Sequence, residues 1–363
     1  MDAVTIPLPV IQMAALGIFL IDTALLTFMI GYRLIEGVRN DRRAPELAAA
    51  RRSMLQAAAL GGQAPTLAYE QIAQGSVSTR ISMLAAAQLL NTIRGDAHVD
   101  LVAYLHGAGY DDRAVAMLSS RNSLLRGVAC ELLGALGDAS SARQLIGLLG
   151  DPDEDVRNTA VRALGRLKDP RAVEDLLQSL EGNRAISPVL VGAALVRIGP
   201  PGALALRKGL HSQESRTRAL CARVLGLLDD FEAEQALIEV LKSDSNRPPL
   251  IEAARALQRV GGKNARGALL ECVHSSQDPE VRVAAISALS GLVDPESGQA
   301  LLVLVSDTDP RVARAAARAL ERSGPEGRIA LAQLEVGTQA ASYAAEVEAV
   351  GDLSRGRLGS GEQ

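Results

Sequence analysis

The sequence contains no tryptophan, and Phe, Trp and Tyr together make up only 2% of its 363 residues. Large mixed cores usually rely on aromatic rings for much of their buried area, so this composition disfavours them. The hydrophobic residues, 48% of the chain, are mostly aliphatic instead. Leu, Ala, Val and Ile can fill the interfaces between stacked helices, and the composition therefore favours helix packing as the source of the core.

Signatures of catalysis and of metal binding are also missing. The four histidines have no adjacent glutamate and no metal-ligand spacing, and neither a phosphate-binding loop nor a G-x-S-x-G motif occurs. We therefore predict no catalytic residue, no metal and no cofactor, and a protein that is not an enzyme. The net charge of −4 argues against a general polyanion binder, so no nucleic-acid partner is predicted.

Cysteine is scarce as well. Cys130, Cys221 and Cys272 fall at unrelated spacings and form no C-x-x-C pattern. An odd number of isolated cysteines inside helical segments is typical of buried free thiols in a reducing compartment. We therefore expect three reduced thiols in helix interiors.

Only one long apolar run occurs, at residues 10–32, and its single charge is Asp22. Its length matches the roughly 20 residues that a helix needs to cross a bilayer. No Lys or Arg precedes the run and no small-residue cleavage site follows it, which favours a membrane anchor over a secretory signal peptide. Arginines cluster after the run, so the positive-inside rule places residues 1–9 outside the bacterial inner membrane and the remainder in the cytoplasm.

A leucine recurs at the end of an apolar helical segment seven times along the chain. The intervals are 31, 31, 30, 32, 32 and 31 residues, and a period this regular indicates a solenoid. Within one period, apolar residues at helical spacing predict two short helices, as at 169–182 and 186–199. The anchor leucines are Leu133, Leu164, Leu195, Leu225, Leu257, Leu289 and Leu320.

Aspartates stand at the joints between these helices. Asp138, Asp169, Asp230 and Asp294 lie five residues beyond an anchor leucine. Asp-Pro pairs at 151–152, 278–279 and 309–310 precede the second helix of their repeats. Aspartate can cap a helix by accepting hydrogen bonds from its free amides, and proline suits the first helical position. The joints therefore carry helix-start signals.

Phrases such as DPDEDVRNTAVRALGRLKDPRAVEDLLQSL and DPEVRVAAISALSGLVDPESGQALLVLV resemble HEAT repeats, most nearly the short subtype known from phycobilisome lyases. The resemblance covers residues 111–324, with degenerate repeats at 78–109. It implies an all-α fold, an α-solenoid of stacked antiparallel HEAT-like helix pairs, here preceded by one transmembrane helix. We assign 33–77 to a basic, Ala-rich juxtamembrane joint, 78–350 to the solenoid with C-terminal capping helices, and 351–363 to a disordered tail.

Arginines recur at three positions relative to the anchor leucine, and in a solenoid each such position forms a column on one face. The first column lies seven residues before the anchor and is the usual arginine position of the repeats that this chain resembles. We expect each of its members to meet an acidic loop residue of a neighbouring repeat. This column comprises Arg126, Arg157, Arg218 and Arg282.

The other two columns lie two residues before and two residues after the anchor, and they share one face of the second helix. Second helices usually line the concave side of this fold type. We therefore interpret these arginines as a partner-binding ridge for an acidic peptide, an acidic protein surface or phosphates. The alternative is a solvated face with local ion pairs to residues such as Glu252 or Glu321. The ridge comprises Arg162, Arg223, Arg255 and Arg318, and Arg166, Arg197, Arg259 and Arg322.

Asp22 lies near the middle of the predicted membrane span, where a carboxylate costs roughly 2.5–3.5 kcal/mol on insertion scales. It is interpreted as a contact with the transmembrane helix of a partner, or as a protonated group that the flanking apolar residues outweigh. Gly17, Ala24 and Gly31 recur every seven residues and form a separate stripe that can admit a close helix neighbour.

These features favour a membrane-anchored cytoplasmic scaffold or adaptor that binds protein partners, at least one of them a membrane protein. It would order a complex such as an envelope polysaccharide-synthesis or secretion assembly. The alternative is a HEAT-type enzyme or enzyme subunit, such as a bilin lyase-like handler of a chromophore or other ligand. Related di-iron hydroxylases need repeated His-Glu pairs, and related DNA glycosylases need aromatic residues for stacking on DNA; this sequence lacks the first and has few of the second.

The predicted orientation can be tested with protease. Right-side-out vesicles treated with an external protease should retain intact repeats, because the membrane shields the cytoplasmic side. Inverted vesicles, the control, should lose them. Immunoblotting of the repeat region checks the outcome, and loss of the repeats from right-side-out vesicles would contradict the orientation.

Overall fold

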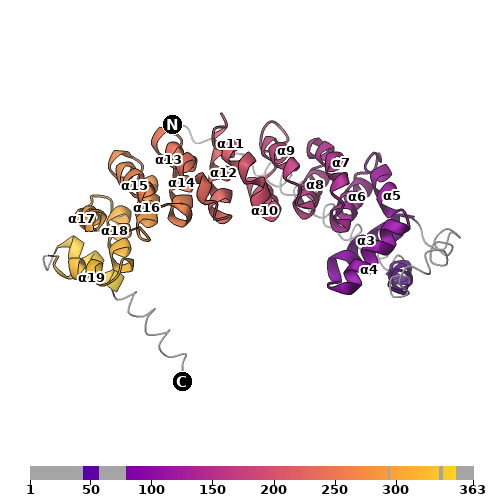
Figure 1. The fold of residues 1–363 in the computed structure, drawn as a ribbon, viewed down its shortest axis with the longest axis horizontal. Helices are drawn as coiled ribbons and strands as arrows, with labels where there is room; N and C mark the ends of the chain where they lie inside the picture. The colour runs from indigo at the N-terminus through magenta and orange to yellow at the C-terminus, as the bar shows by residue number, and fades with distance from the viewer. Residues whose placement is uncertain (1–43, 57–78, 293–294, 335–337, 349–363) are drawn as a thin grey trace, which may run out of the picture. The chain divides into compact units, whose positions relative to one another are not determined.

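A computed structural model of the chain describes residues 44–56, 79–292, 295–334 and 338–348. Over these ranges the secondary structure is helical, with turns and short connections between the helices (Figure 1). The chain divides into two compact units, Met1–Ser120 and Arg121–Gln363, and the division falls within the predicted repeat region.

The first unit contains a helix at residues 44–56, followed by α3 (Thr79–Thr92), α4 (Asp96–Gly107) and α5 (Tyr110–Met117). Its core is aliphatic apart from two tyrosines, and the guanidinium of Arg51 donates a hydrogen bond to Gln88 of α3. The fully buried side chains include Met54, Met83, Leu101, Leu105 and Tyr110.

The second unit is a series of helix pairs in which the second helices pack side by side in one row (Figure 1). The second helices are α6 (Ser123–Leu136), α8 (Glu154–Leu167), α10 (Pro188–Ile198), α12 (Ser215–Leu227), α14 (Arg247–Val260), α16 (Pro279–Leu289) and α18 (Pro310–Arg322). The first helices are α7 (Ala142–Gly147), α9 (Val173–Gln178), α11 (Ala203–Gly209), α13 (Glu234–Ser243), α15 (Lys263–Ser275) and α17 (Pro295–Leu304). The described part ends with α19 (Pro325–Ala332) and a helix at residues 339–348.

The aspartates at the joints cap helices at most of the predicted positions. Two predictions differ from the structure. Asp230 makes no capping bond and lies instead 3.5 Å from Arg207. The cap of α8 is Asp153, the residue directly before the helix, whereas Asp151 binds Arg126 and accepts a hydrogen bond from the amide of Asp153. The confirmed caps, which accept bonds of 2.8–2.9 Å from the amide two residues further on, are Asp138, Asp169, Asp278 and Asp309.

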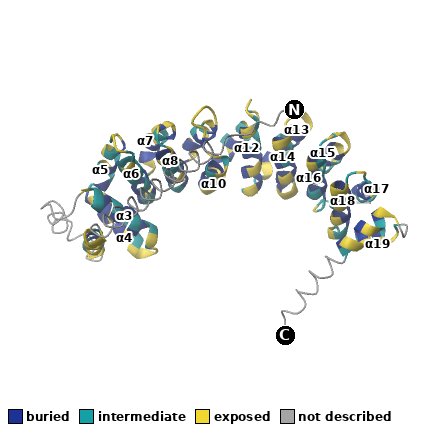
Figure 2. Cartoon of the chain, turned by 180° about the vertical axis from the view of Figure 1, so that it is seen from behind, coloured by how far each residue is buried: buried dark blue, intermediate teal, exposed yellow. Residues whose placement is uncertain are grey.

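All seven anchor leucines are buried, with at most 1% of their surface exposed. Figure 2 shows buried segments in the helices of both rows. The residue after the anchor sets how closely successive second helices approach. A Cβ atom added to Gly134, Gly165 or Gly226 would lie 2.6–2.8 Å from the Cα atom of an alanine on the next second helix. These glycines therefore permit backbone contact where a larger residue would hold the helices apart.

The three cysteines are buried free thiols, as predicted. Burial raises the pKa of Cys130 and of Cys221 to about 12, and that of Cys272 to about 11. A thiol with so high a pKa is almost entirely protonated at neutral pH and therefore chemically inert.

No single helix within the described ranges is long and apolar enough to cross a membrane. Two consecutive helical segments, Pro188–Ile198 and Pro200–Gly209, reach that length and hydrophobicity only when they are taken together. The chain bends by 109° between them. Outside the described residues lie the segments 1–9 and 351–363, the predicted span at 10–32, and its Asp22, Gly17, Ala24 and Gly31. The predicted cap Asp294 and all of the predicted joint at 33–77 except residues 44–56 also lie outside them.

Replacement of Gly134 by alanine tests the close approach of α6 and α8. The new methyl group would lie 2.6 Å from the Cα atom of Ala163, so the helices must separate, and we expect a loss of about 1–3 kcal/mol in the free energy of unfolding.

Gly127→Ala in the same helix is the matched control, because nothing lies within 4 Å of its added Cβ atom. It should be neutral or stabilise by up to about 1 kcal/mol, because glycine is a poor helix former. Chemical denaturation of both variants distinguishes the two effects. Equal stability of Gly134→Ala and the unchanged protein would contradict the account.

Candidate partner-binding surface of the second helices

The arginines seven residues before the anchor tie adjacent repeats together. Arg126 on α6 donates two hydrogen bonds of 2.7 Å to Asp151, which lies in the loop before α8. Arg218 on α12 binds Asp244 before α14 in the same bidentate way, and Arg282 on α16 binds Asp307 before α18. The predicted ladder of arginines and loop aspartates is therefore confirmed at three positions.

Arg157 is the exception in this column. The position that corresponds to Asp151 in the next repeat is Gly182, which offers no carboxylate. The guanidinium of Arg157 is buried and donates instead to the backbone carbonyl oxygens of Asp151 and Pro152, at 2.8 and 3.2 Å. This arginine stabilises the loop of its own repeat rather than a neighbour.

The three ladder aspartates have lowered pKa values. Burial by itself would raise the pKa of Asp151, Asp244 and Asp307. The hydrogen bonds from the paired arginine and from a nearby backbone amide outweigh burial and hold each pKa below its ordinary value. The ladder therefore depends on the charged form of these carboxylates.

Three of the eight ridge arginines are engaged in ion pairs, one of them with a residue of its own helix. Arg223 donates two hydrogen bonds to the buried carboxylate of Glu252 on α14, and Arg255 donates to the same carboxylate at 3.0 Å. Arg259 binds Asp229 through two hydrogen bonds of 3.0 Å and also the carbonyl oxygen of Gly226. The local ion pairing predicted for Glu252 is confirmed, and it interrupts the ridge on α12 and α14.

A cluster of like charge lies on α8 and α10. Arg162 donates a hydrogen bond to the hydroxyl of Thr159, and neither Arg162 nor Arg197 forms an ion pair with a described residue. Burial lowers the pKa of Arg166; Glu131 opposes this shift, and the nearby positive charges of Arg197 and Arg162 add to it. We name Arg162, Arg166 and Arg197 the α8–α10 cluster.

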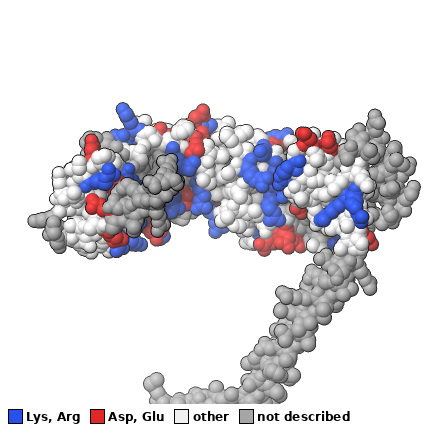
Figure 3. Space-filling model, turned by 90° about the horizontal axis from the view of Figure 1, so that it is seen from below, with Lys and Arg blue, Asp and Glu red and all other residues white. Residues whose placement is uncertain are grey.

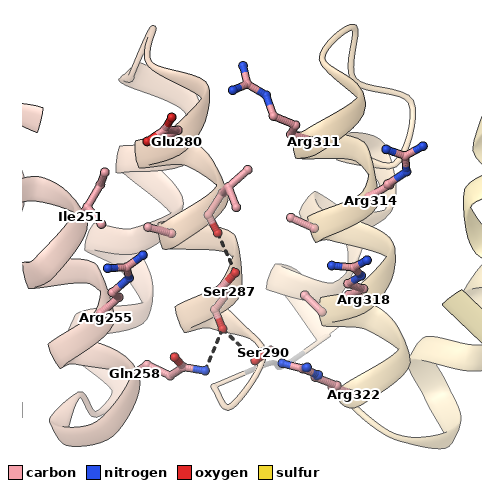
Figure 4. Close-up of a pocket in the computed structure, with 14 residues that line it drawn as sticks. Ile251, Arg255, Gln258, Glu280, Ser287, Ser290, Arg311, Arg314, Arg318 and Arg322 are labelled. Carbon is pink, nitrogen blue, oxygen red and sulfur yellow. Dashed lines mark hydrogen bonds between the residues drawn. The ribbon is translucent and has the colours of Figure 1, made fainter. Parts of the chain in front are cut away.

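The last two ridge residues, Arg318 and Arg322, line a groove of about 630 Å³ between α14, α16 and α18. Arg255 and Gln258 lie on its α14 side, and Ser290 lies on α16 (Figure 4). The predicted single ridge therefore consists of two separate positive regions with an ion-paired section between them. In the second unit, Figure 3 shows basic side chains gathered in patches with acidic side chains between them.

Arg311 and Arg314 also line this groove, but they stand at none of the three arginine positions that recur across the repeats. Both lie on α18, where Arg311, Arg314, Arg318 and Arg322 are spaced by three, four and four residues. This spacing places the side chains along one helix face. The spacing of the arginines within α18 is therefore the sequence feature that could have identified Arg311 and Arg314.

Among the residues that the structure describes, no group of three or more His, Cys, Asp or Glu side chains is arranged to hold a metal ion. In the first unit, His106 lies 2.7 Å from the carboxylate of Asp111, an isolated pair at the end of α4.

Comparison with known proteins places these observations in context. A family model described as HEAT repeats matches residues 112–186, 203–290 and 267–344, which is more than half of the chain. A HEAT repeat-containing taxis protein of Halobacterium salinarum is 28% identical over 173 residues, 47% of this chain and 40% of that relative. The chain thus spans well under two thirds of the length of this relative.

Two solved structures are similar at low sequence identity. The karyopherin Kap121p bound to Pho4p matches with a TM-score of 0.48 and 14% identity, covering 83% of this chain and 41% of that one. The complex of CpcE and CpcF of phycocyanin lyase from Nostoc sp. PCC7120 matches with a TM-score of 0.30 and 21% identity, covering 66% and 94%. Neither likeness extends beyond the fold.

The ladder predicts how stability depends on pH. A group whose pKa is depressed in the folded state contributes stability that is present above its unfolded pKa, about 3.9 for aspartate, and is lost as the pH falls through the folded pKa. We therefore expect the melting temperature to decline as the pH falls from about 5 to 3.

Asp244→Asn should lower the free energy of unfolding at pH 7 by about 1–3 kcal/mol, and the melting temperature should fall with it. The variant should also show a shallower decline of the melting temperature as the pH falls. The control is Asp100→Asn, an exposed position on α4 outside the ladder, which should leave both properties unchanged. Circular dichroism melts between pH 7 and 3 measure both. An unchanged pH profile of Asp244→Asn would contradict the proposed contribution of the ladder.

Proposed function

Because this chain belongs to the HEAT-repeat family, we propose that it is a non-enzymatic scaffold that binds protein partners through the second helices of its repeats. The observation that carries the proposal is the α8–α10 cluster. Its arginines lie on a regular helical surface, and two of them, Arg162 and Arg197, form no ion pair with a described residue. Arginine is well suited to bind carboxylates on a partner because its planar group donates several hydrogen bonds at once.

A structural role accounts less well for this cluster than for the ladder. The ladder arginines are largely buried and paired, whereas Arg162 and Arg197 are exposed and lie near another positive charge. Like charges placed together raise the free energy of the unbound protein, and an anionic partner would relieve this repulsion. The partner that fits is therefore an acidic protein surface.

The proposal also includes location. The apolar run at 10–32 would anchor the scaffold in the bacterial inner membrane with the repeats in the cytoplasm, and Asp22 would contact a partner's membrane helix. The client would be a membrane assembly, such as one for envelope polysaccharide synthesis or secretion. Since the relative in Halobacterium salinarum is a taxis protein, a taxis assembly joins this set of candidates.

Affinity purification of the full-length protein from native membranes tests the proposed function. Partners identified by mass spectrometry should be recovered with the unchanged protein and reduced about tenfold or more by Arg162→Glu/Arg166→Glu/Arg197→Glu, because three attractions become repulsions. Deletion of residues 1–36 should release the complex from the membrane.

The matched control is Lys208→Glu/Arg216→Glu, which reverses two exposed charges on α11 and α12 outside the cluster. It should recover the same partners as the unchanged protein. Absence of any reproducible partner, or full recovery with the cluster reversed, would reject the scaffold.

A further inference from the structure

The groove between α14, α16 and α18 combines an apolar floor with positive walls. Small and aliphatic residues, among them Val283, Ala284, Ala315 and Ala319, form part of its lining, and Ala284 and Ala319 are buried. Polar groups come from Gln258, whose amide donates to the carbonyl oxygen of Ser287, and from Ser290 just after α16 (Figure 4). Among the described residues that line the groove, none is aromatic.

Arginines supply most of the charge in this groove. Arg255 is held by Glu252 at 3.0 Å, and Arg311 by Asp309 at 2.8 Å. Arg318 and Arg322 form no ion pair with any residue that the structure describes. Within the described ranges, the acidic residues therefore leave part of the positive charge uncompensated.

Two further charged residues contribute less to the groove. Arg314 turns away from α16 and lies over the ring of Tyr343, with its guanidinium 3.3 Å from Glu346 (Figure 4). Glu280 is the one acidic residue that the described part of the chain contributes to the lining, and it binds Arg247. The anion-binding capacity therefore rests chiefly on Arg318 and Arg322, and Arg255 and Arg311 add charge that Glu252 and Asp309 partly offset. We name these four residues the groove arginines.

Exposure separates the groove arginines from the ladder. The side chain of Arg282, which joins α16 to the next repeat, is 20% exposed, whereas those of Arg255 and Arg311 are 62% and 58% exposed. Exposed ion pairs contribute little to stability because water and salt screen them. The fold therefore does not require these arginines in the way that it requires the ladder.

We propose that this groove binds an acidic segment of a partner protein in which carboxylate side chains alternate with small apolar ones. The inference rests on the proposed scaffold function and adds the chemistry of one partner site. In an extended segment the two sets of side chains lie on opposite faces, so the carboxylates meet the groove arginines on one side and the apolar side chains lie on the other.

The spacing of the arginines fits such a segment. With a helical rise of 1.5 Å per residue, Arg318 and Arg322 lie about 6 Å apart along α18, and Arg311 and Arg322 about 16 Å apart. An extended peptide places side chains on the same face about 6.8 Å apart, close to the first of these spacings. Nucleic acid fits less well, because stacking on bases needs aromatic side chains and the chain carries a net charge of −4.

The test uses a fluorescein-labelled peptide of about twelve residues that alternates Glu and Val, and the full-length protein purified in detergent. Fluorescence anisotropy should detect binding that weakens with salt, because its attraction is ionic. Arg318→Glu/Arg322→Glu should weaken binding at least tenfold. Lys208→Glu/Arg216→Glu, with the same number of reversed charges elsewhere, should change it less than twofold.

Three results would overturn the inference. The first is a failure of the unchanged protein to bind the Glu-Val peptide. Equal binding by the unchanged protein and by Arg318→Glu/Arg322→Glu, with the circular dichroism spectrum of the variant unchanged, would have the same meaning. The second is equal binding of a Gln-Val peptide, which would remove the role of charge. The third is tighter binding of single-stranded DNA of similar length at the same groove, which would assign it to nucleic acid.

Purification from native membranes separates this inference from the scaffold proposal. One outcome is that Arg318→Glu/Arg322→Glu retains every partner that the α8–α10 cluster variant loses and also binds the peptide as the unchanged protein does. In that case the groove inference fails and the scaffold proposal stands. If the unchanged protein recovers no reproducible partner, the scaffold proposal fails as well.

Discussion

The close contact between successive second helices is the constraint on which the rest of the repeat structure depends. A buried anchor leucine fills the space between the helix rows, and beside it a glycine of one helix lies against an alanine of the next, as Gly134 does against Ala163. This contact fixes the distance between repeats, and so brings Arg126 within hydrogen-bonding distance of Asp151. At the groove between α14, α16 and α18 the residues after the anchor leucines are Gln258 and Ser290 instead of glycine, and both line the groove.

The position of an arginine on this framework determines its role. Seven residues before the anchor, an arginine reaches the loop of the next repeat and is used for stability when an aspartate is present, as with Arg218 and Asp244. Close to the anchor, the outcome depends on the neighbouring helix. Glu252 holds Arg223 and Arg255 in ion pairs, whereas α8 and α10 bring positive charges together around Arg166. Residual positive charge remains at two places, and these places are the candidates for binding.

Sequence periodicity predicted the fold well, because the leucine interval, the joint aspartates and the first arginine column repeat along the chain. It could not predict where the pattern is broken. That Gly182 deprives Arg157 of a carboxylate follows only once the loops are aligned in space. The pairing of Arg259 with Asp229 joins residues 30 positions apart and depends on helix rotation. Arg311 was detectable from the spacing within α18, whereas the groove itself required the packing of three helices.

The most direct test of the central claim, that partners occupy the second-helix surface, is site-specific photo-crosslinking in intact cells. A photoreactive amino acid would replace Thr159 on α8 or Ala315 in the groove, and Leu204, an exposed residue on the first helix α11, would serve as the comparison site. The account predicts crosslinked partner adducts from Thr159 and Ala315 and none from Leu204. Adducts from Leu204 alone would contradict it and move the binding surface to the first helices.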